Sequence, residues 1–298
     1  MSKYHIKCNF KEKLIEIDIS RFFGGFLDKS FSPYYLEDSD EPKTGADLES
    51  SFDILPVYMQ VKVSEGLKTI TKQPSSKRKN RSNLEDVREF RDNLDLDYAD
   101  DYFLFFKLRK MAKTAIDFQH NILMSYTNTG FSHAFYVAPL SINKKEYEKS
   151  LFNKNNYRTI NPFYYHHYEL KDTKWTSLFG FVPFLRNHIS IIPHEEVATD
   201  KHYYAYSKSG IDVTWHSPEF ISNEPTRLSD AMIDIFKKFE DNKENYNVKQ
   251  LAGRLKEMPI MKGVNLKIDN PWEIIKLHGD ILAKEYEIKQ LIFLKRKK

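Results

Sequence analysis

The chain has 298 residues, of which 41% are hydrophobic and 30% charged, and its formal net charge is +4. That length allows one large domain or two small ones with a sizeable core, and the mild basic excess permits nucleic-acid binding without demanding it. The single cysteine, Cys8, excludes an internal disulfide framework and a cysteine-based zinc site. The chain holds neither an apolar run of bilayer length nor a secretory signal, so we expect a cytoplasmic protein without membrane contact.

The first predicted element is a helix. Asn9 and Glu12 have the spacing of a capping box. Apolar residues at helical spacing follow them: Phe10, Leu14, Ile17 and Phe22. The segment 14–20 also alternates, with isoleucines on one side, so a strand is the competing interpretation. We favour the helix, ending near Gly24.

The central motif combines Asp47 with Gln60 and Lys62. Asp47 follows a glycine turn and opens a segment that can run as a strand to Asp53, and a more apolar strand then carries Gln60 and Lys62. Strand side chains alternate, so Gln60 and Lys62 share a face opposite Met59, Val61 and Val63. If the two strands pair as a hairpin, an acid, an amide oxygen and an ammonium meet at one point. Such a group suits a hard metal ion and a water beside a phosphate.

The string Thr44-Gly45-Ala46-Asp47, followed by Gln60-Val61-Lys62, resembles the PD-(D/E)XK (restriction-endonuclease-like) nucleases, in the subgroup written TGAD…QxK. The subgroup continues with a helix that carries a glutamine and then an aromatic strand, which correspond here to Gln119 and residues 133–137. The resemblance covers approximately residues 9–140 and implies an α-β-β-β-α-β core.

This resemblance implies Mg²⁺- or Mn²⁺-dependent hydrolysis of phosphodiester bonds, in DNA, with a role in phage defence or restriction. Asp47, Gln60 and Glu12 would hold the metal, with Glu16 in reserve for Glu12, and Lys62 would complete the catalytic set. Gln60 replaces the commoner glutamate and brings one negative charge fewer. The family also implies a homodimer or a partner defence protein. Two alternatives remain: an inactive module that binds nucleic acid or a partner, and a structural protein in which residues 43–62 form an ordinary hairpin.

After the motif, residues 68–81 carry basic residues and no acid, so they form either a phosphate-contacting arm or a solvated loop. The basic residues are Lys68, Lys72, Lys77, Arg78, Lys79 and Arg81. Residues 82–85 read as a second capping box that opens a helix, and acidic residues end it. We expect residues 68–101 to be an insertion into the core.

A strand is expected at residues 102–108 and an amphipathic helix from Met111 through Ile122. Gln119 and His120 lie on or beside its apolar face. His120 is expected to be a satisfied boundary residue, whereas Gln119 either supports the site or bonds the backbone. A short apolar strand follows at residues 133–138.

The remaining residues predict strands at 188–192 and a hairpin of 203–206 with 211–215, and then helices from Pro225 onward. His194, His202 and His216 lie in this part, but their spacing matches no recognised ligand pattern. The overall prediction is a mixed α/β fold with a restriction-endonuclease-like core sheet in residues 1–140. A strand-rich extension at 141–222 and a helical region at 223–298 would complete it, the latter for dimerisation, a partner or DNA contact.

Overall fold

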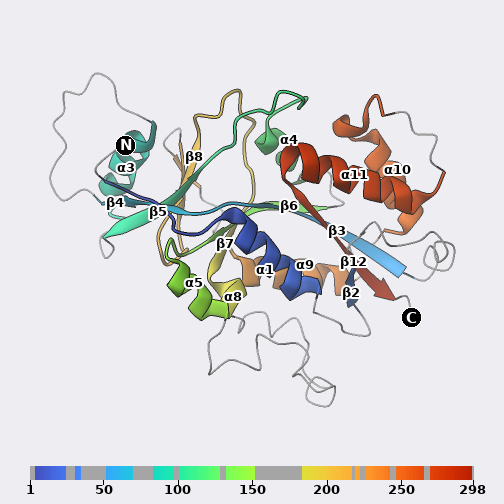
Figure 1. The fold of residues 1–298 in the computed structure, drawn as a ribbon, viewed down its shortest axis with the longest axis horizontal. Helices are drawn as coiled ribbons and strands as arrows, with labels where there is room; N and C mark the ends of the chain where they lie inside the picture. Colours follow the sequence, from blue (N-terminus) through green and yellow to red (C-terminus); the bar gives the residue numbers. More distant parts are fainter. Residues whose placement is uncertain are drawn as a thin grey trace, which may run out of the picture.

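The computed structural model confirms the mixed α/β class: the chain folds into two six-stranded sheets with helices packed against them (Figure 1). The structure describes residues 4–24, 31–34, 52–69, 83–96, 101–127, 132–151, 183–216, 219–221, 226–241, 246–264 and 269–296. Within these ranges, no helix is both long enough and apolar enough to cross a membrane.

The larger part of the core surrounds a mixed sheet with the strand order β11-β7-β6-β3-β12-β2. Its strands are β2 (Phe31–Tyr34), β3 (Phe52–Val61), β6 (His133–Pro139), β7 (His188–Ile191), β11 (Thr226–Arg227) and β12 (Lys289–Arg296). The central strand β3 runs parallel to β6 and antiparallel to β12. Segments from both ends of the chain therefore meet beside the predicted motif.

Helices cover both faces of this sheet (Figure 1). One face carries α1 (Glu12–Gly24), α5 (Lys144–Leu151), α8 (Pro183–Arg186) and α9 (Leu228–Glu240). The other carries α4 (Gln119–Thr127), α10 (Val248–Glu257) and α11 (Pro271–Tyr286). The alternation of β3 separates the two layers. Met59 and Val61 pack toward α1 and α9, while Ile54 and Tyr58 pack toward α4 and α11.

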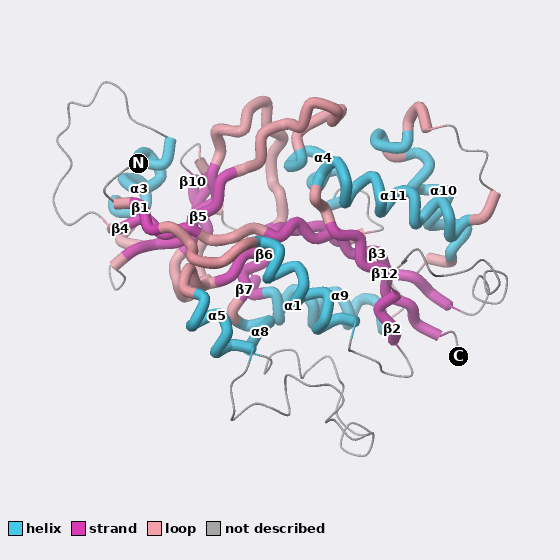
Figure 2. Tube along the Cα trace, viewed as in Figure 1, coloured by secondary structure: helices cyan, strands magenta, loops and turns pink. Residues whose placement is uncertain are grey.

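The second sheet is antiparallel, with the order β1-β4-β5-β8-β9-β10. Figure 2 labels its strands β1, β4, β5 and β10. Its strands are β1 (His5–Ile6), β4 (Glu65–Lys68), β5 (Tyr102–Lys107), β8 (Tyr203–Tyr206), β9 (Val213–Trp215) and β10 (Glu219–Phe220). The predicted hairpin is confirmed as the β8–β9 pair. One face of this sheet joins the α4 and α11 layer, and the other packs against α3 (Asn83–Asn93).

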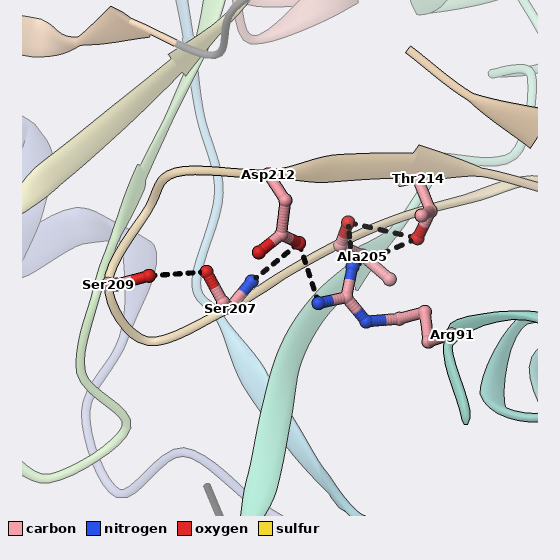
Figure 3. A network of polar contacts seen from close by, with 6 residues as sticks. All are labelled: Arg91, Ala205, Ser207, Ser209, Asp212 and Thr214. Carbon is pink, nitrogen blue, oxygen red and sulfur yellow. Dashed lines mark hydrogen bonds and ion pairs between the residues drawn. The ribbon is translucent and has the colours of Figure 1, made fainter. Parts of the chain in front are cut away.

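Arg91 of α3 forms hydrogen bonds and an ion pair with residues of the second sheet and the turn within it (Figure 3). Its side chain is fully buried and pairs with the Asp212 carboxylate at 2.6 Å. Arg91 Nη1 donates to the Ala205 carbonyl and to Thr214 Oγ1, each at 3.2 Å. Asp212 also accepts the Ser207 backbone N–H. A buried guanidinium is tolerated here because its charge and its donors have partners.

The prediction that one strand ends at Asp53 and a second strand carries Gln60 and Lys62 is wrong, because Phe52 to Val61 form one continuous strand. The antiparallel neighbour of β3 is β12, from the C-terminal end of the chain. Pro56 does not interrupt β3, since β6 pairs with it only from Val57 onward. Local composition suggested a turn here because it contains no information about β12, the distant strand that stabilises the extended backbone of β3.

The helix predicted near the N-terminus is confirmed as α1, but its capping box is not formed. The Asn9 backbone N–H donates to the Ile142 carbonyl, and the Glu12 carboxylate accepts from the Val63 backbone N–H. The buried face is also rotated from the predicted one, since Ile15 and Ile19 are buried and Ile17 is exposed.

Two further elements differ from prediction. The helix expected from Met111 begins only at Gln119, and Met111 and Ile116 are exposed. Strand β12 was not predicted at all, although the helices α9, α10 and α11 before it were. At the end of β12, Lys295 and Arg296 are opposite Asp53 and Phe52 of β3 in the strand register. Strand β12 lies between β2 and β3 and has a short apolar run with charged residues at both ends. Such a short run does not show the alternation that identifies a half-exposed strand.

Candidate functional site

The site lies where β3 ends, beside the N-terminus of α4 and the C-terminus of α11. Gln60 is the penultimate residue of β3, and Lys62 follows its last residue. Gln119 is the first residue of α4, and Tyr286 is the last residue of α11. Main-chain groups at helix ends lack partners within the helix, so side chains there have polar groups to bind.

A buried hydrogen-bonded chain connects these residues. Lys62 Nζ donates to Gln119 Oε1 at 3.0 Å, and Gln119 Nε2 donates to Gln60 Oε1 at 2.7 Å. Gln119 Nε2 also donates to the Tyr286 carbonyl, and Gln60 Nε2 donates to the Val61 carbonyl. Gln119 therefore orients both motif residues and also supplies a donor to the free end of α11.

The relative positions of α4, α11 and β12 depend on a second buried chain. Tyr126 Oη donates to His278 Nε2 at 2.8 Å, and His278 Nδ1 donates to Gln290 Oε1 at 2.6 Å. Burial lowers the pKa of His278 to about 4. The ring is thus neutral at pH 7 and can accept and donate at once. This contact fixes the elements that bring Gln119 and Tyr286 to β3.

Lys62 is an unusual cation because it is only 5% exposed. Its hydrogen-bond partner is a neutral amide, and no carboxylate among the described residues lies within ion-pair distance of its ammonium. Burial lowers the pKa of Lys62, and the more distant charges of Glu12 and Glu287 oppose that shift. A perturbed lysine at the edge of a core is typical of functional sites.

Glu12 reaches the same point from the opposite face of the sheet. Its Oε1 accepts the Val63 backbone N–H at 3.4 Å, one residue beyond Lys62. Burial raises the pKa of Glu12 although Lys62 and the Val63 N–H act in the other direction. Glu287 and Glu16 raise it further through repulsion. Among the described residues, Lys62 is therefore the cation that acts on the Glu12 carboxylate, and it does not outweigh the effect of burial.

The reserve candidate Glu16 has other partners. Its Oε2 lies 3.2 Å from Lys13 Nζ and 3.5 Å from Lys289 Nζ. Both ammonium groups neutralise the charge that a metal ion would otherwise use. Glu12 is consequently the better placed of the two candidates on α1.

Arg109 adds a second cation near Lys62. Its Nη2 pairs with Glu287 at 3.0 Å, while its Nη1 is buried without a hydrogen-bond partner among the described residues. The charge of Arg109 also contributes to the lowered pKa of Lys62. A buried guanidinium donor without a partner is costly, so this atom is a natural contact for an anion.

The oxygen atoms at this site among the described residues supply only part of the ligand set of a divalent metal ion. Glu12 supplies one carboxylate, and Gln60 Oε1 retains a second lone pair beside its bond to Gln119. Asp47, the expected second carboxylate, lies outside the described residues, as do Lys72, Lys77, Arg78, Lys79 and Arg81 of the basic segment. Lys68 is described and lies exposed at the end of β4.

The sequence predicted Gln60, Lys62 and Glu12 at one site, and the structure brings Gln60 and Lys62 together with Glu12 nearby. Gln119, predicted either to support the site or to bond the backbone, does both. The sequence-based prediction did not include Arg109, Glu287 or the carbonyl of Tyr286. No local pattern marks these residues, because they reach the site from a loop and from the end of α11. His120, expected to be a satisfied boundary residue, bonds Tyr136 Oη and the Glu195 carbonyl.

Comparisons with protein-family models, with curated proteins and with solved structures find no match to this chain.

Proposed function

We propose that this protein is a metal-dependent nuclease that hydrolyses phosphodiester bonds, with DNA as its substrate. The observation that carries the proposal is the buried Lys62–Gln119–Gln60 chain at the end of β3, with the Glu12 carboxylate close by. The same residue types are those that the TGAD…QxK resemblance assigns to the site. The strand that pairs with β3 beside this site is β12, which the resemblance did not predict.

The ion would be Mg²⁺ or Mn²⁺, held by Glu12, Asp47 and Gln60, and it would polarise the scissile phosphate and lower the pKa of a bound water. Its charge would stabilise the ionised form of Glu12, whose pKa is raised by burial and, to a smaller extent, by the charges of Glu287 and Glu16. Asp47 supplies the second negative charge that Gln60 does not bring.

The chain itself supplies the electrostatic stabilisation. The Lys62 ammonium has donors beyond the one directed at Gln119, and these can face the charge that develops on phosphate oxygens. Gln119 holds that ammonium in place, so it is a positioning residue. Arg109 Nη1 offers a further donor to the same anion. The basic residues of segment 68–81 would contact the nucleic-acid backbone outside the reacting phosphate.

A second candidate is a nuclease-like module without catalysis, which binds nucleic acid or a partner protein. The observation in its favour is that Gln60 Oε1 and the Lys62 ammonium already have protein partners, and both side chains are buried. Mg²⁺ titration by calorimetry separates the two functions, because only the nuclease needs a metal ion at this point.

The direct test is incubation of purified protein with plasmid, linear DNA, single-stranded DNA and RNA, with Mn²⁺ and with chelator. We expect metal-dependent DNA cleavage that Asp47→Ala and Lys62→Ala each reduce by about a thousandfold, the effect of removing a group that stabilises transition-state charge. Lys238→Ala is the matched control, since Lys238 pairs with Asp234 on α9 at the other face of the sheet. Cleavage that survives in both site variants would falsify the assignment. DNA binding without cleavage by the wild type would favour the module.

Any role in phage defence or restriction, and any homodimer or partner defence protein, is part of the same proposal. Size-exclusion chromatography with light scattering, alone and with DNA, tests the dimer.

A further inference from the structure

A second group of metal-ligating side chains lies away from the end of β3, on the second sheet. His194 and Glu195 belong to the segment after β7, and Glu219 lies in β10. One potential ligand atom from each residue lies within 4.8 Å of the other two. An imidazole with two carboxylates is a donor set for divalent transition-metal ions.

The strand register explains why these residues meet. Glu219 of β10 is directly opposite Trp215 of β9, so their side chains share a face. The Trp215 indole N–H donates to Glu195 Oε1. Glu195 is thereby held next to Glu219, although 24 positions separate them in the sequence. The other carboxylate oxygen of Glu195 can then serve as a metal ligand.

The segment that carries His194 and Glu195 is fixed by α4. His120 Nε2 donates to the Glu195 carbonyl at 2.8 Å. Asn121 donates to the Val197 carbonyl at 2.9 Å and accepts the Val197 N–H at 2.8 Å. The backbone from the Glu195 carbonyl to Val197 is therefore held before any ligand binds, which lowers the entropic cost of assembling a site.

The imidazole of His194 has the outer partner that ligating histidines need. Its Nε2 lies 3.0 Å from Glu219 Oε1, and its Nδ1 lies 3.2 Å from Tyr204 Oη. If a metal ion bound His194 Nε2 and Glu219 Oε1, each at about 2.05 Å, the two atoms would lie about 2.9 Å apart for a right angle at the metal. For a tetrahedral angle they would lie about 3.3 Å apart. The observed 3.0 Å falls within that span. With Nε2 on the metal, Nδ1–H would donate to Tyr204, an outer contact that orients the ring.

We infer that His194, Glu195 and Glu219 form a binding site for a divalent transition-metal ion, with Zn²⁺ as its representative. His194 Nε2 and one oxygen from each glutamate are the ligands, and water completes the coordination because Glu219 is exposed. Trp215 and Tyr204 are positioning residues for Glu195 and His194. The site is separate from the proposed Mg²⁺ site and does not depend on the nuclease assignment.

The test is calorimetric titration of chelator-treated protein with Zn²⁺, together with Co²⁺ as a spectroscopic probe. We expect about one saturable Zn²⁺ site per chain, and visible Co²⁺ bands characteristic of four or five ligands. His194→Gln, Glu195→Gln and Glu219→Gln should each weaken Zn²⁺ binding at least about tenfold, and Tyr204→Phe by about tenfold. Glu219→Gln is the decisive variant because its exposed side chain bears little on folding.

Two controls separate this site from other imidazoles and from the end of β3. His5 pairs with Glu65 at 2.7 Å, and the described residues offer no third ligand there, so His5→Gln should leave Zn²⁺ affinity unchanged. Glu12→Gln should leave it unchanged too, even though it is expected to abolish Mg²⁺-dependent cleavage. Absence of saturable Zn²⁺ binding, equal binding by Glu219→Gln, or equal losses in His5→Gln would each overturn the inference.

Discussion

Lys62 and Arg91 are the two cations that the described part of the chain buries almost completely, and their surroundings differ. Arg91 pairs with Asp212 at 2.6 Å and has further acceptors on β8 and β9 (Figure 3). Lys62 has the neutral Gln119 as its hydrogen-bond partner, and burial lowers its pKa. Arg91 is thus a structural cation with its charge neutralised, whereas Lys62 has no carboxylate within ion-pair distance among the described residues and is offset only by the more distant Glu12 and Glu287.

The difference teaches how a functional lysine can be distinguished from a structural one. A charge that serves the fold is matched within the fold, as at Arg91. A charge that serves a substrate has to be left partly unmatched, since the substrate supplies the counterion. Around Lys62, Arg109 Nη1 likewise lacks a hydrogen-bond partner in the part of the chain that the structure describes, and burial raises the pKa of Glu12.

The largest expected effect is on folding stability at Arg91. Arg91→Met should lower the free energy of unfolding by about 3–5 kcal/mol, because it leaves the buried Asp212 carboxylate without its cation. Lys62→Met should change it by less than about 1 kcal/mol, since it removes a desolvated charge. Urea denaturation of both variants measures the contrast. Equal losses in the two variants would remove the distinction between a structural and a functional cation.

Gln119 is the residue through which Lys62 contacts the rest of the fold. Gln119→Leu should cost about 1–3 kcal/mol, because Gln60 Oε1 and the Tyr286 carbonyl lose their donor and stay buried. In a double-mutant cycle with Lys62→Met, the two losses should be non-additive, as expected for directly bonded side chains. Strict additivity would mean that the 3.0 Å contact between them carries no energy.

The pH dependence of stability should also distinguish the two cations. The folded-state pKa of Lys62 lies below its ordinary value of 10.5, so the unfolded chain binds more protons between those two values. Stability should therefore rise with pH across that alkaline window and fall as pH drops through the folded-state pKa. Arg91 stays charged throughout. From neutral pH to about pH 10, the wild type should gain stability relative to Lys62→Met, which lacks this titration; a constant difference would contradict the shift.

The smallest effect is expected at Glu12. Its folded-state pKa lies above the ordinary 4.5, so the ionised form is disfavoured in the folded protein and stability falls as pH rises through that window. Glu12→Gln should accordingly raise the melting temperature slightly at neutral pH and remove the further rise that Mg²⁺ gives the wild type. The exposed Glu257→Gln is the control, and its melting temperature should follow that of the wild type. An identical Mg²⁺ response in Glu12→Gln would exclude Glu12 as a ligand.

Much of the local structure could be predicted from the sequence. Regular spacing of apolar residues marks α9 and α10, and alternation marks the hairpin of β8 and β9. The period-two pattern also placed Gln60 and Lys62 on one face, opposite Met59 and Val61. These features depend on residues close together in the chain, where backbone geometry alone determines which side chains share a face.

The tertiary structure decided what those side chains meet. Strand β12 replaced the expected hairpin beside β3, and the end of α11 brought the Tyr286 carbonyl to Gln119. The group formed by His194, Glu195 and Glu219 likewise arises from the pairing of β9 with β10. Sequence spacing carries no information about such contacts, because they depend on which distant strands pair and on the burial that follows. The types of chemistry available were therefore set by the sequence, and the partners of each charged group by the fold.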